Sequence, residues 1–531
     1  MDNGIYRSIH TLDDDSLLNI FHHVQPVLLD QDEADHNRIL RGGEWGRERW
    51  WYKLVHICRR WRYLVLRSAS HLGLRLVCTH GTPVADMLAN SPPLPLIIDY
   101  IDQGHGVTAD EEAGIVLALQ QRDRISRIRL VVPMPELQRL VMAMDGEFPT
   151  LEHLYMAPPT KDTTGLILHE TFQAHLRHFI LINFSFSVGS PLLTNTTAAS
   201  LVTLVLQRIH PSAYFRPNAL LQRLSLIPHL ETFIFGFDSP VHNRDVERQL
   251  LRELDMTPIT LPNLRWLGFK GASAYLEAVL PQITTPLLER LEISFLNQLI
   301  FSVPHLLRFM DDAENFNFGS AILTFHEESL CMNAYPTEGA RVYALQLEVG
   351  CRDFDWQVAS AAQIINTFRT PCSAVEHLTL EYGGNFKSSE LPNDDDLVQW
   401  RELLGSFNNV KTLSVFGCLV GELSRAQMSD RGQSLGLFPE LKELLCPARR
   451  DASHGDAISS FVDAHQIAGR PSPLVHTILP VDHLLQVRGP MSCDSQLIQT
   501  PSNILLCEAL CPGRCPCGRV PRSYIFSPRC P

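Results

Sequence analysis

One short apolar pattern recurs along most of this chain and constrains its fold more than any other feature. It consists of an apolar residue, two variable residues, an apolar residue, one variable residue and a third apolar residue. Ten copies start 25, 25, 29, 34, 24, 54, 33, 35 and 31 residues apart, and the interval of 54 predicts two units with a degraded copy near 322–325. The copies are Leu151/Leu154/Met156, Leu176/Phe179/Leu181, Leu201/Leu204/Leu206, Leu230/Phe233/Phe235, Leu264/Leu267/Phe269, Leu288/Leu291/Ile293, Val342/Leu345/Leu347, Val375/Leu378/Leu380, Val410/Leu413/Val415 and Leu441/Leu444/Cys446.

The array extends toward the N-terminus through weaker copies at Leu94/Ile97/Asp99 and Ile125/Ile128/Leu130. Segments between the copies have helical spacing, so each unit reads as a strand, a turn and a helix. Such units resemble those of a leucine-rich-repeat solenoid, an α/β fold with a parallel sheet on its concave side. The alternative is a doubly wound α/β domain, but no Gly-rich turn follows any strand. The helical segments are 109–122, 135–144, 273–280, 359–368, 397–404 and 456–465.

A solenoid of this kind predicts which side chains face the concave surface. Side chains alternate along a strand, so residues beside and between the apolar triplet residues face away from the core. We expect an exposed apolar surface in the first half and a more polar, carboxylate-bearing surface in the second, where a protein target binds. The alternative is that a loop of the same chain covers Ile180, Val205 and Ile234. The target-binding candidates are Tyr155, Ile180, Val205, Ile234, Trp266, Glu292, Glu348 and Glu381.

The first 70 residues have a different pattern, which predicts two amphipathic helices that bury each other. Thr11 can cap a helix whose first turn carries Asp13, Asp14 and Asp15, and Leu17, Ile20, Phe21 and Val24 then form one apolar stripe. The second helix runs from Trp51 through Cys58 to Val65 with the same spacing.

These residues resemble an F-box, whose pattern ends in V-C-x-x-W-R-x-L. The likeness departs from the family at Asp13, where proline is usual, and in the long connection 25–49. The resemblance implies docking on the Skp-type adaptor of a cullin-based ubiquitin ligase, with no catalytic role and no cofactor. The residues that match, and would bind the adaptor, are Leu12, Asp14, Leu17, Leu18, Ile20, Phe21, Ile57, Cys58, Trp61 and Leu64.

Composition limits the compartment and the partners. The hydrophobic content of 45% is enough for a large core, and no run approaches the roughly 20 apolar residues of a membrane span. We expect no secretory signal and no membrane association, which places the protein in the cytoplasm or nucleus. A net charge of −13 argues against nucleic acid as a partner.

Catalytic and metal motifs are not found in the sequence. It has no G-x-S-x-G elbow and no phosphate-binding loop, and Leu330 replaces the second histidine of the zinc-protease pattern begun by His326. Six of the 13 cysteines lie in 491–531, spaced unlike zinc knuckles, so we expect a disordered tail rather than a metal site.

The expected organisation is an F-box-like helical module at 1–70, a leucine-rich-repeat-like solenoid at 71–490 and the tail at 491–531. Two functions follow from it. In the first, the chain is the substrate-recognition subunit of a ubiquitin ligase. In the second, the helices only cap the first repeat, and the protein is a scaffold unrelated to degradation.

Overall fold

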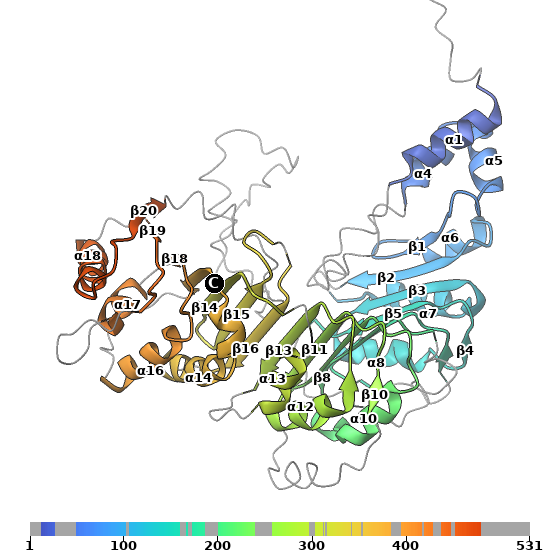
Figure 1. Ribbon diagram of the computed structural model, residues 1–531. Helices are drawn as coiled ribbons and strands as arrows, with labels where there is room; N and C mark the ends of the chain where they lie inside the picture. The colour runs from blue at the N-terminus through green and yellow to red at the C-terminus, as the bar shows by residue number, and fades with distance from the viewer. Residues whose placement is uncertain are drawn as a thin grey trace, which may run out of the picture.

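A 16-stranded, mostly parallel sheet forms the centre of this mixed α/β protein (Figure 1). Thr11 and the cysteine-rich segment 491–531 lie outside the described residues. The computed structural model describes residues 12–26, 49–101, 106–159, 166–167, 172–185, 200–238, 258–296, 303–311, 313, 316–340, 342–351, 354–383, 394–416, 419–427, 437–447 and 452–478.

The first half of the sheet is a run of parallel strands in chain order. Each strong repeat copy from 151 to 293 coincides with one of these strands, as the spacing predicted. The strands are β1 (Leu76–Cys78), β2 (Leu96–Ile101), β3 (Ile125–Val131), β5 (His153–Ala157), β7 (His178–Ile182), β8 (Thr203–Ile209), β9 (Thr232–Phe237), β11 (Trp266–Gly271) and β13 (Arg290–Phe295).

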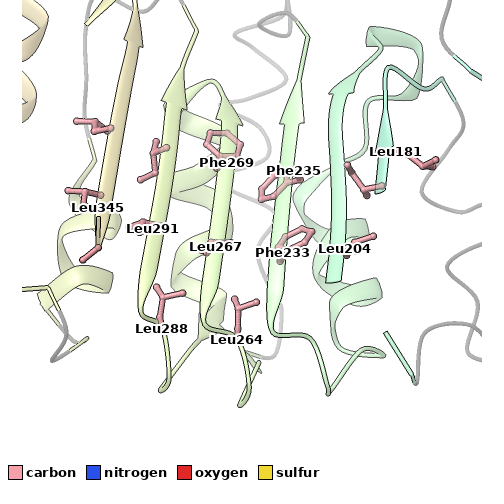
Figure 2. Packing of buried hydrophobic residues seen from close by; sticks show 14 of the residues in the cluster. Leu181, Leu204, Phe233, Phe235, Leu264, Leu267, Phe269, Leu288, Leu291 and Leu345 are labelled. Atoms are coloured by element: carbon pink, nitrogen blue, oxygen red, sulfur yellow. The ribbon is translucent and has the colours of Figure 1, made fainter. Parts of the chain in front are cut away.

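The apolar triplets form continuous ladders across neighbouring strands. Leu267 on β11 pairs with Phe233 on one side and Leu291 on the other, and all three are buried. Leu264 begins its triplet just before β11 and is also fully buried; Figure 2 shows these ladders. Full burial of one such side chain contributes roughly 1.5–3 kcal/mol, so the repeated triplet accounts for the stacking of the units.

The weak copy at Leu94/Ile97/Asp99 was assigned to the wrong face. Ile98 and Tyr100 belong to the main core, whereas Asp99 alternates with them and pairs in register with Arg129. The segment is apolar at both parities, and a one-residue shift of register exchanges the two faces of a strand. Pairing between β2 and β3 also shifts at Leu96/Ile97, which the sequence did not reveal.

The degraded copy near 322–325 does lie on a strand, but the interval of 54 residues does not hold two parallel units, which corrects that part of the sequence prediction. The interval contains α13 (Pro304–Asp311) and an antiparallel pair, β14 (Ser320–Phe325) and β15 (Ser329–Tyr335). β15 is antiparallel to β16 (Leu345–Gly350) as well, and β16 pairs directly with β13. The sheet order is therefore β13, β16, β15, β14, β17, and the chain reverses its direction of travel across the sheet.

Parallel pairing resumes at β17 and continues to the end of the described chain. Two further pairs, β4 with β6 and β10 with β12, form small separate sheets. The remaining strands are β17 (His377–Tyr382), β18 (Thr412–Val415), β19 (Glu443–Pro447), β20 (Leu474–Ile478), β4 (Glu147–Phe148), β6 (Gln173–Ala174), β10 (Ile259–Thr260) and β12 (Ile283–Thr284).

Helices follow one face of the sheet, with α8, α10, α12 and α13 side by side beneath the first half (Figure 1). All six predicted helical segments are helical over most of their length. The helices after β1 are α6 (Val84–Asn90), α7 (Ala109–Leu119), α8 (Met134–Met142), α10 (Pro217–Leu224), α12 (Ser273–Val279), α13, α14 (Phe354–Thr367), α15 (Arg369–Ser373), α16 (Asp394–Leu404), α17 (Leu419–Gln427) and α18 (Ala452–Ile467), with short 3-10 turns at Arg122–Arg124, Pro211–Ala213 and Leu280–Gln282.

The N-terminal helices differ from the prediction at two points. α1 spans Asp14–Val24, and its N-cap is Asp13, whose Oδ1 accepts the Ser16 N–H at 2.7 Å. The predicted second helix is two helices, α4 (Trp50–Val55) and α5 (Arg59–Arg67). The break falls at Cys58, an extended N-cap residue whose sulfur accepts the Trp61 N–H. The Cys58 side chain caps a new helix at this point, so the chain does not continue as one helix although the apolar spacing is unbroken.

The helical module joins the edge of the sheet. Trp51 donates from Nε1 to the Arg75 carbonyl at 3.1 Å, and Arg49 donates to the Val77 carbonyl at 3.0 Å. Buried residues of α1 and of the segment leading into β1 belong to one continuous hydrophobic core. The module therefore covers the N-terminal edge of the sheet, and the core has no break near residue 70.

Candidate interaction surfaces

The interior of the helical module is part of the main hydrophobic core. Phe21 and Trp61 meet edge to face with ring centroids 4.8 Å apart, and Leu17 and Leu64 pack in the same core. These four predicted adaptor-binding residues therefore hold the module together and are not on its surface.

The same module has an apolar edge on its surface. Ile20 and Val24, one turn apart on α1, are 38% and 58% exposed. Ile57, in the turn between α4 and α5, is 55% exposed. Leu12, Leu18 and Cys58 are partly buried beside the core, and Asp14 forms an ion pair with Arg60 at 2.6 Å. Of the predicted adaptor-binding residues, Ile20 and Ile57 are thus the most accessible apolar ones.

The sheet carries a second hydrophobic cluster on the face that points away from the triplet core. We call this face the second face. Its members alternate with the core residues along β5, β7, β8, β9 and β11. Tyr155, Ile180, Val205 and Ile234 pair in register from strand to strand, whereas Trp266 pairs with Thr232. They are Tyr155, Ala157, Ile180, Ile182, Val205, Ile234 and Trp266.

The second face was expected to expose these apolar side chains, and that expectation is wrong. No member of the cluster is more than 9% exposed. Alternation predicted correctly which residues share the face, but alternation gives only direction and not accessibility. The apolar residues Tyr155, Ile180, Val205, Ile234 and Trp266 are a buried second core. Their role in target binding stays a prediction.

Arg290 closes the cluster at its C-terminal end. Its guanidinium carbon lies 3.9 Å from the ring centroid of Trp266 and 4.0 Å from that of Tyr343. Glu292 accepts a hydrogen bond from the Tyr343 hydroxyl at 3.3 Å and lies 3.7 Å from Arg290 Nη2. The stacked cation and its carboxylate separate the apolar cluster from the polar half of the face. Tyr343 was missed because it precedes its strand, outside the alternating positions.

Carboxylates also occur farther along the sheet, and their role in target binding stays a prediction. Glu348 on β16 accepts a hydrogen bond from Ser294 Oγ at 2.9 Å. Burial raises the pKa of Glu381 on β17, although a hydrogen bond from Thr324 opposes this. Burial, reinforced by the charges of Glu348 and Glu292, also raises the pKa of the Cys331 thiol. Cys331 is therefore protonated at neutral pH and is not a nucleophile.

The start of the second face is polar and basic. His153 and His178 stack on adjacent strands with ring centroids 4.3 Å apart. Burial lowers the pKa of His153 to about 2, helped by Arg127, His178, Arg75 and Arg177. Burial also lowers the pKa of His178 to about 4, with Arg177 and Arg127 acting in the same direction. Both imidazoles are neutral at pH 7.

Two features that the described residues lack bear on the class of site. Across the described ranges, no helix has both the length and the apolar character needed to cross a bilayer. In the same part of the chain, no three His, Cys, Asp or Glu side chains are grouped so as to hold a metal ion.

Comparison with known proteins gives little further information. No family model matches the chain, and no curated protein matches its sequence. Among solved structures, the chain is similar to the leucine-rich repeat-containing protein LegL7 from Legionella pneumophila, with a TM-score of 0.26 and 11% identity. The match covers 73% of this chain and 97% of that one. A likeness at this TM-score carries no argument about function.

Proposed function

We propose that this chain is the non-catalytic substrate-recognition subunit of a cullin-based ubiquitin ligase. In this proposal the helical module binds a Skp-type adaptor, and the second face of the sheet receives a protein target. The chain supplies proximity between the target and an enzyme bound elsewhere in the assembly. The observation that supports it best is the exposure of Ile20, Val24 and Ile57 on a helical module most of whose other apolar residues are packed in or against the core.

Two isoleucines of the helical module are exposed to solvent, which a protein interface would explain. Ile20 and Ile57 come from two different segments whose buried residues join the one continuous core of the protein. Clustered apolar side chains on the surface of a folded protein commonly mark an interface. Leu17 and Phe21 lie on the same helix as Ile20 but are buried, so they are not available to a partner. The F-box resemblance assigns this edge to the adaptor.

Substitution of an exposed edge residue tests the adaptor proposal. Ile20→Asp should weaken co-purification of a Skp-type adaptor, because an unpaired carboxylate would be buried in an apolar interface. A burial cost of about 2 kcal/mol corresponds to roughly 30-fold lower affinity. Leu17 and Phe21 are unsuitable targets, because a charge at either position would unfold the module.

The matched control is Leu287→Asp, which changes another exposed apolar residue, 46% exposed, beside the start of β13. The control should bind the adaptor as the wild type does. Equal binding by the wild type and Ile20→Asp, with unchanged unfolding transitions, would refute the adaptor role.

A second candidate function is a repeat scaffold unrelated to degradation. It is favoured by the hydrogen bonds from Trp51 and Arg49 to carbonyls at the edge of β1. Repeat proteins need a terminal cap, and these helices provide one whatever else they bind. Under this alternative the wild-type chain would not retain the adaptor at all.

A further inference from the structure

A basic row crosses the start of the second face. Arg127 on β3, His153 on β5, His178 on β7 and Thr203 on β8 are consecutive partners in the strand register. The row is perpendicular to the strands, so its polar side chains project from one face at intervals of about 4.8 Å. At pH 7 the charged side chain of this row is Arg127, because both imidazoles are neutral and Thr203 has no charge.

The two imidazoles provide hydrogen-bonding groups within the row. His178 uses Nδ1 for a contact with Thr203 Oγ1 at 3.1 Å. Within the described residues, Nε2 of His178 has no hydrogen-bond partner. Each ring is only half-buried, so a ligand could reach it.

Arg177 adds an exposed guanidinium next to His178. No carboxylate in the part of the chain that the structure describes forms an ion pair with Arg177. Arg265 occupies the same position one step before β11 and does form one, with Glu289. The two positions are equivalent, because each arginine carbonyl accepts two N–H groups from the start of the next strand. The charged residue that immediately precedes the neighbouring strand β5 is the exposed Glu152, whose carbonyl accepts the N–H groups of both Arg177 and His178; within the described residues it forms no ion pair with Arg177.

We infer that Arg177, His178 and the adjoining basic row bind an oxyanion carried by the target protein. The inference rests on the proposal that this face receives a target. A guanidinium and an imidazole N–H match the acceptor oxygens of a phosphate or carboxylate. One oxyanion on a peptide fits this small basic site better than an extended polyanion, which the surrounding negative charge would repel.

Anion binding at this row should be coupled to proton uptake. A bound anion favours the charged imidazole, so the pKa of His178 in the complex lies above its value in the free protein. At pH values between the pKa of His178 in the free protein and its higher pKa in the complex, the complex holds more protons than the free protein. Affinity consequently rises as the pH falls.

The first measurement is titration of the full chain with sulfate, which stays dianionic from pH 5 to 8. Resonances of the histidine rings, followed by NMR, report binding at His153 and His178. Arg177→Gln and His178→Gln should each weaken sulfate binding by about tenfold, the value of one charge-assisted hydrogen bond. Arg265→Gln is the matched control and should not change it, and Arg177→Lys should restore part of the affinity.

Three peptides of equal length, carrying phosphoserine, glutamate or serine, identify the source of the anion. Tighter binding of the phosphoserine peptide alone assigns a phosphorylated target, and equal gains with glutamate assign an acidic one. Equal binding of all three, or equal losses of sulfate binding in Arg177→Gln and Arg265→Gln, overturns the inference. None of these assays involves the adaptor, so failure here leaves the result with Ile20→Asp unaffected, and the converse also holds.

Discussion

Asp99 on β2 and Arg129 on β3 form a buried bidentate ion pair on the second face. Arg129 Nε donates to Oδ1 at 2.6 Å and Nη2 donates to Oδ2 at 2.9 Å. Each side chain is only 6% exposed. Burial raises the pKa of the Asp99 carboxyl even though the hydrogen bonds and charge of Arg129 lower it. The pair lies beside Tyr155, in register with Arg129, and closes the apolar cluster at its N-terminal end.

Removing one partner of this pair should destabilise the fold strongly. Asp99→Ala removes two hydrogen bonds and an opposite charge from the buried Arg129 guanidinium, and breaking a buried ion pair in this way typically costs about 3–5 kcal/mol. Equilibrium urea unfolding measures the loss. The double variant Asp99→Ala/Arg129→Met should recover most of it, because no isolated charge remains. A single variant as stable as the wild type would show that water reaches the guanidinium.

Leu17 and Ile20 lie three residues apart on α1 and should respond differently to truncation. Leu17→Ala should lower the free energy of unfolding by about 2–5 kcal/mol, because Leu17 is fully buried. Ile20→Ala should change it by about 1 kcal/mol or less, because Ile20 is partly solvated. Similar losses for both variants would mean that the edge of the module is covered within this chain.

Gly268 on β11 is required by the packing of the second face. A Cβ at this position would lie 2.8 and 2.9 Å from the γ carbons of Ile234. Gly268→Ala should therefore cost about 1–3 kcal/mol through overpacking. The cost should largely disappear in an Ile234→Ala background.

Gly421 in α17 is the control for that substitution. Nothing lies within 4 Å of a Cβ added there. Gly421→Ala should stabilise the protein by about 0.5–1 kcal/mol, because alanine restricts the unfolded chain and favours helix. A loss of stability at Gly421, or none at Gly268, would contradict the packing described for the second face.

The stacked histidines predict a pH dependence of stability. A histidine in the unfolded chain has a pKa near 6.5, whereas His178 titrates at about 4 and His153 at about 2 in the folded protein. Below pH 6.5 the unfolded state therefore binds more protons than the folded state. As the pH is lowered through this range, the free energy of unfolding decreases by about 1.4 kcal/mol per pH unit for each histidine. For His178 the window is about pH 6.5 to 4, and for His153 it extends toward pH 2.

Urea unfolding of the wild type and His178→Gln at pH 6.5 and 5 measures this slope above the range where carboxylates dominate. The variant should lose less stability between the two pH values. His229→Gln, at an exposed position, should keep the wild-type slope. If the free energy of unfolding had the same pH dependence in the wild type and in His178→Gln, the pKa of His178 would not be lowered in the folded state.

Sequence pattern predicted the strands well where apolar residues alternate with polar ones. Along β13, Leu291 and Ile293 are buried while Arg290 and Glu292 are accessible. The same reasoning failed at β2, where both parities are apolar and only the pairing with β3 decides which face Ile98 occupies. Periodicity gives a direction for each side chain and leaves the register to tertiary contacts.

The antiparallel reversal had a signal in the sequence. Only three residues separate Phe325 from Ser329, whereas a parallel connection needs a dozen or more. The burial of Tyr155 and Trp266 had no such signal, because nothing in a strand's own residues shows what packs above it. Partners from distant segments, such as Tyr343 above Arg290, also cannot be inferred from local spacing.

The reversal between β13 and β17 changes how the chain can acquire its structure. In a simple tandem array, each new unit docks on the one just made, and growth proceeds from either end. Here the strand that pairs with β13 on the side away from β11 is β16, which begins about fifty residues later in the chain. A fragment ending at Tyr335 would lack β16, so both β15 and β13 would have an unpaired side. The two halves of the sheet therefore depend on the same strand and should fold cooperatively.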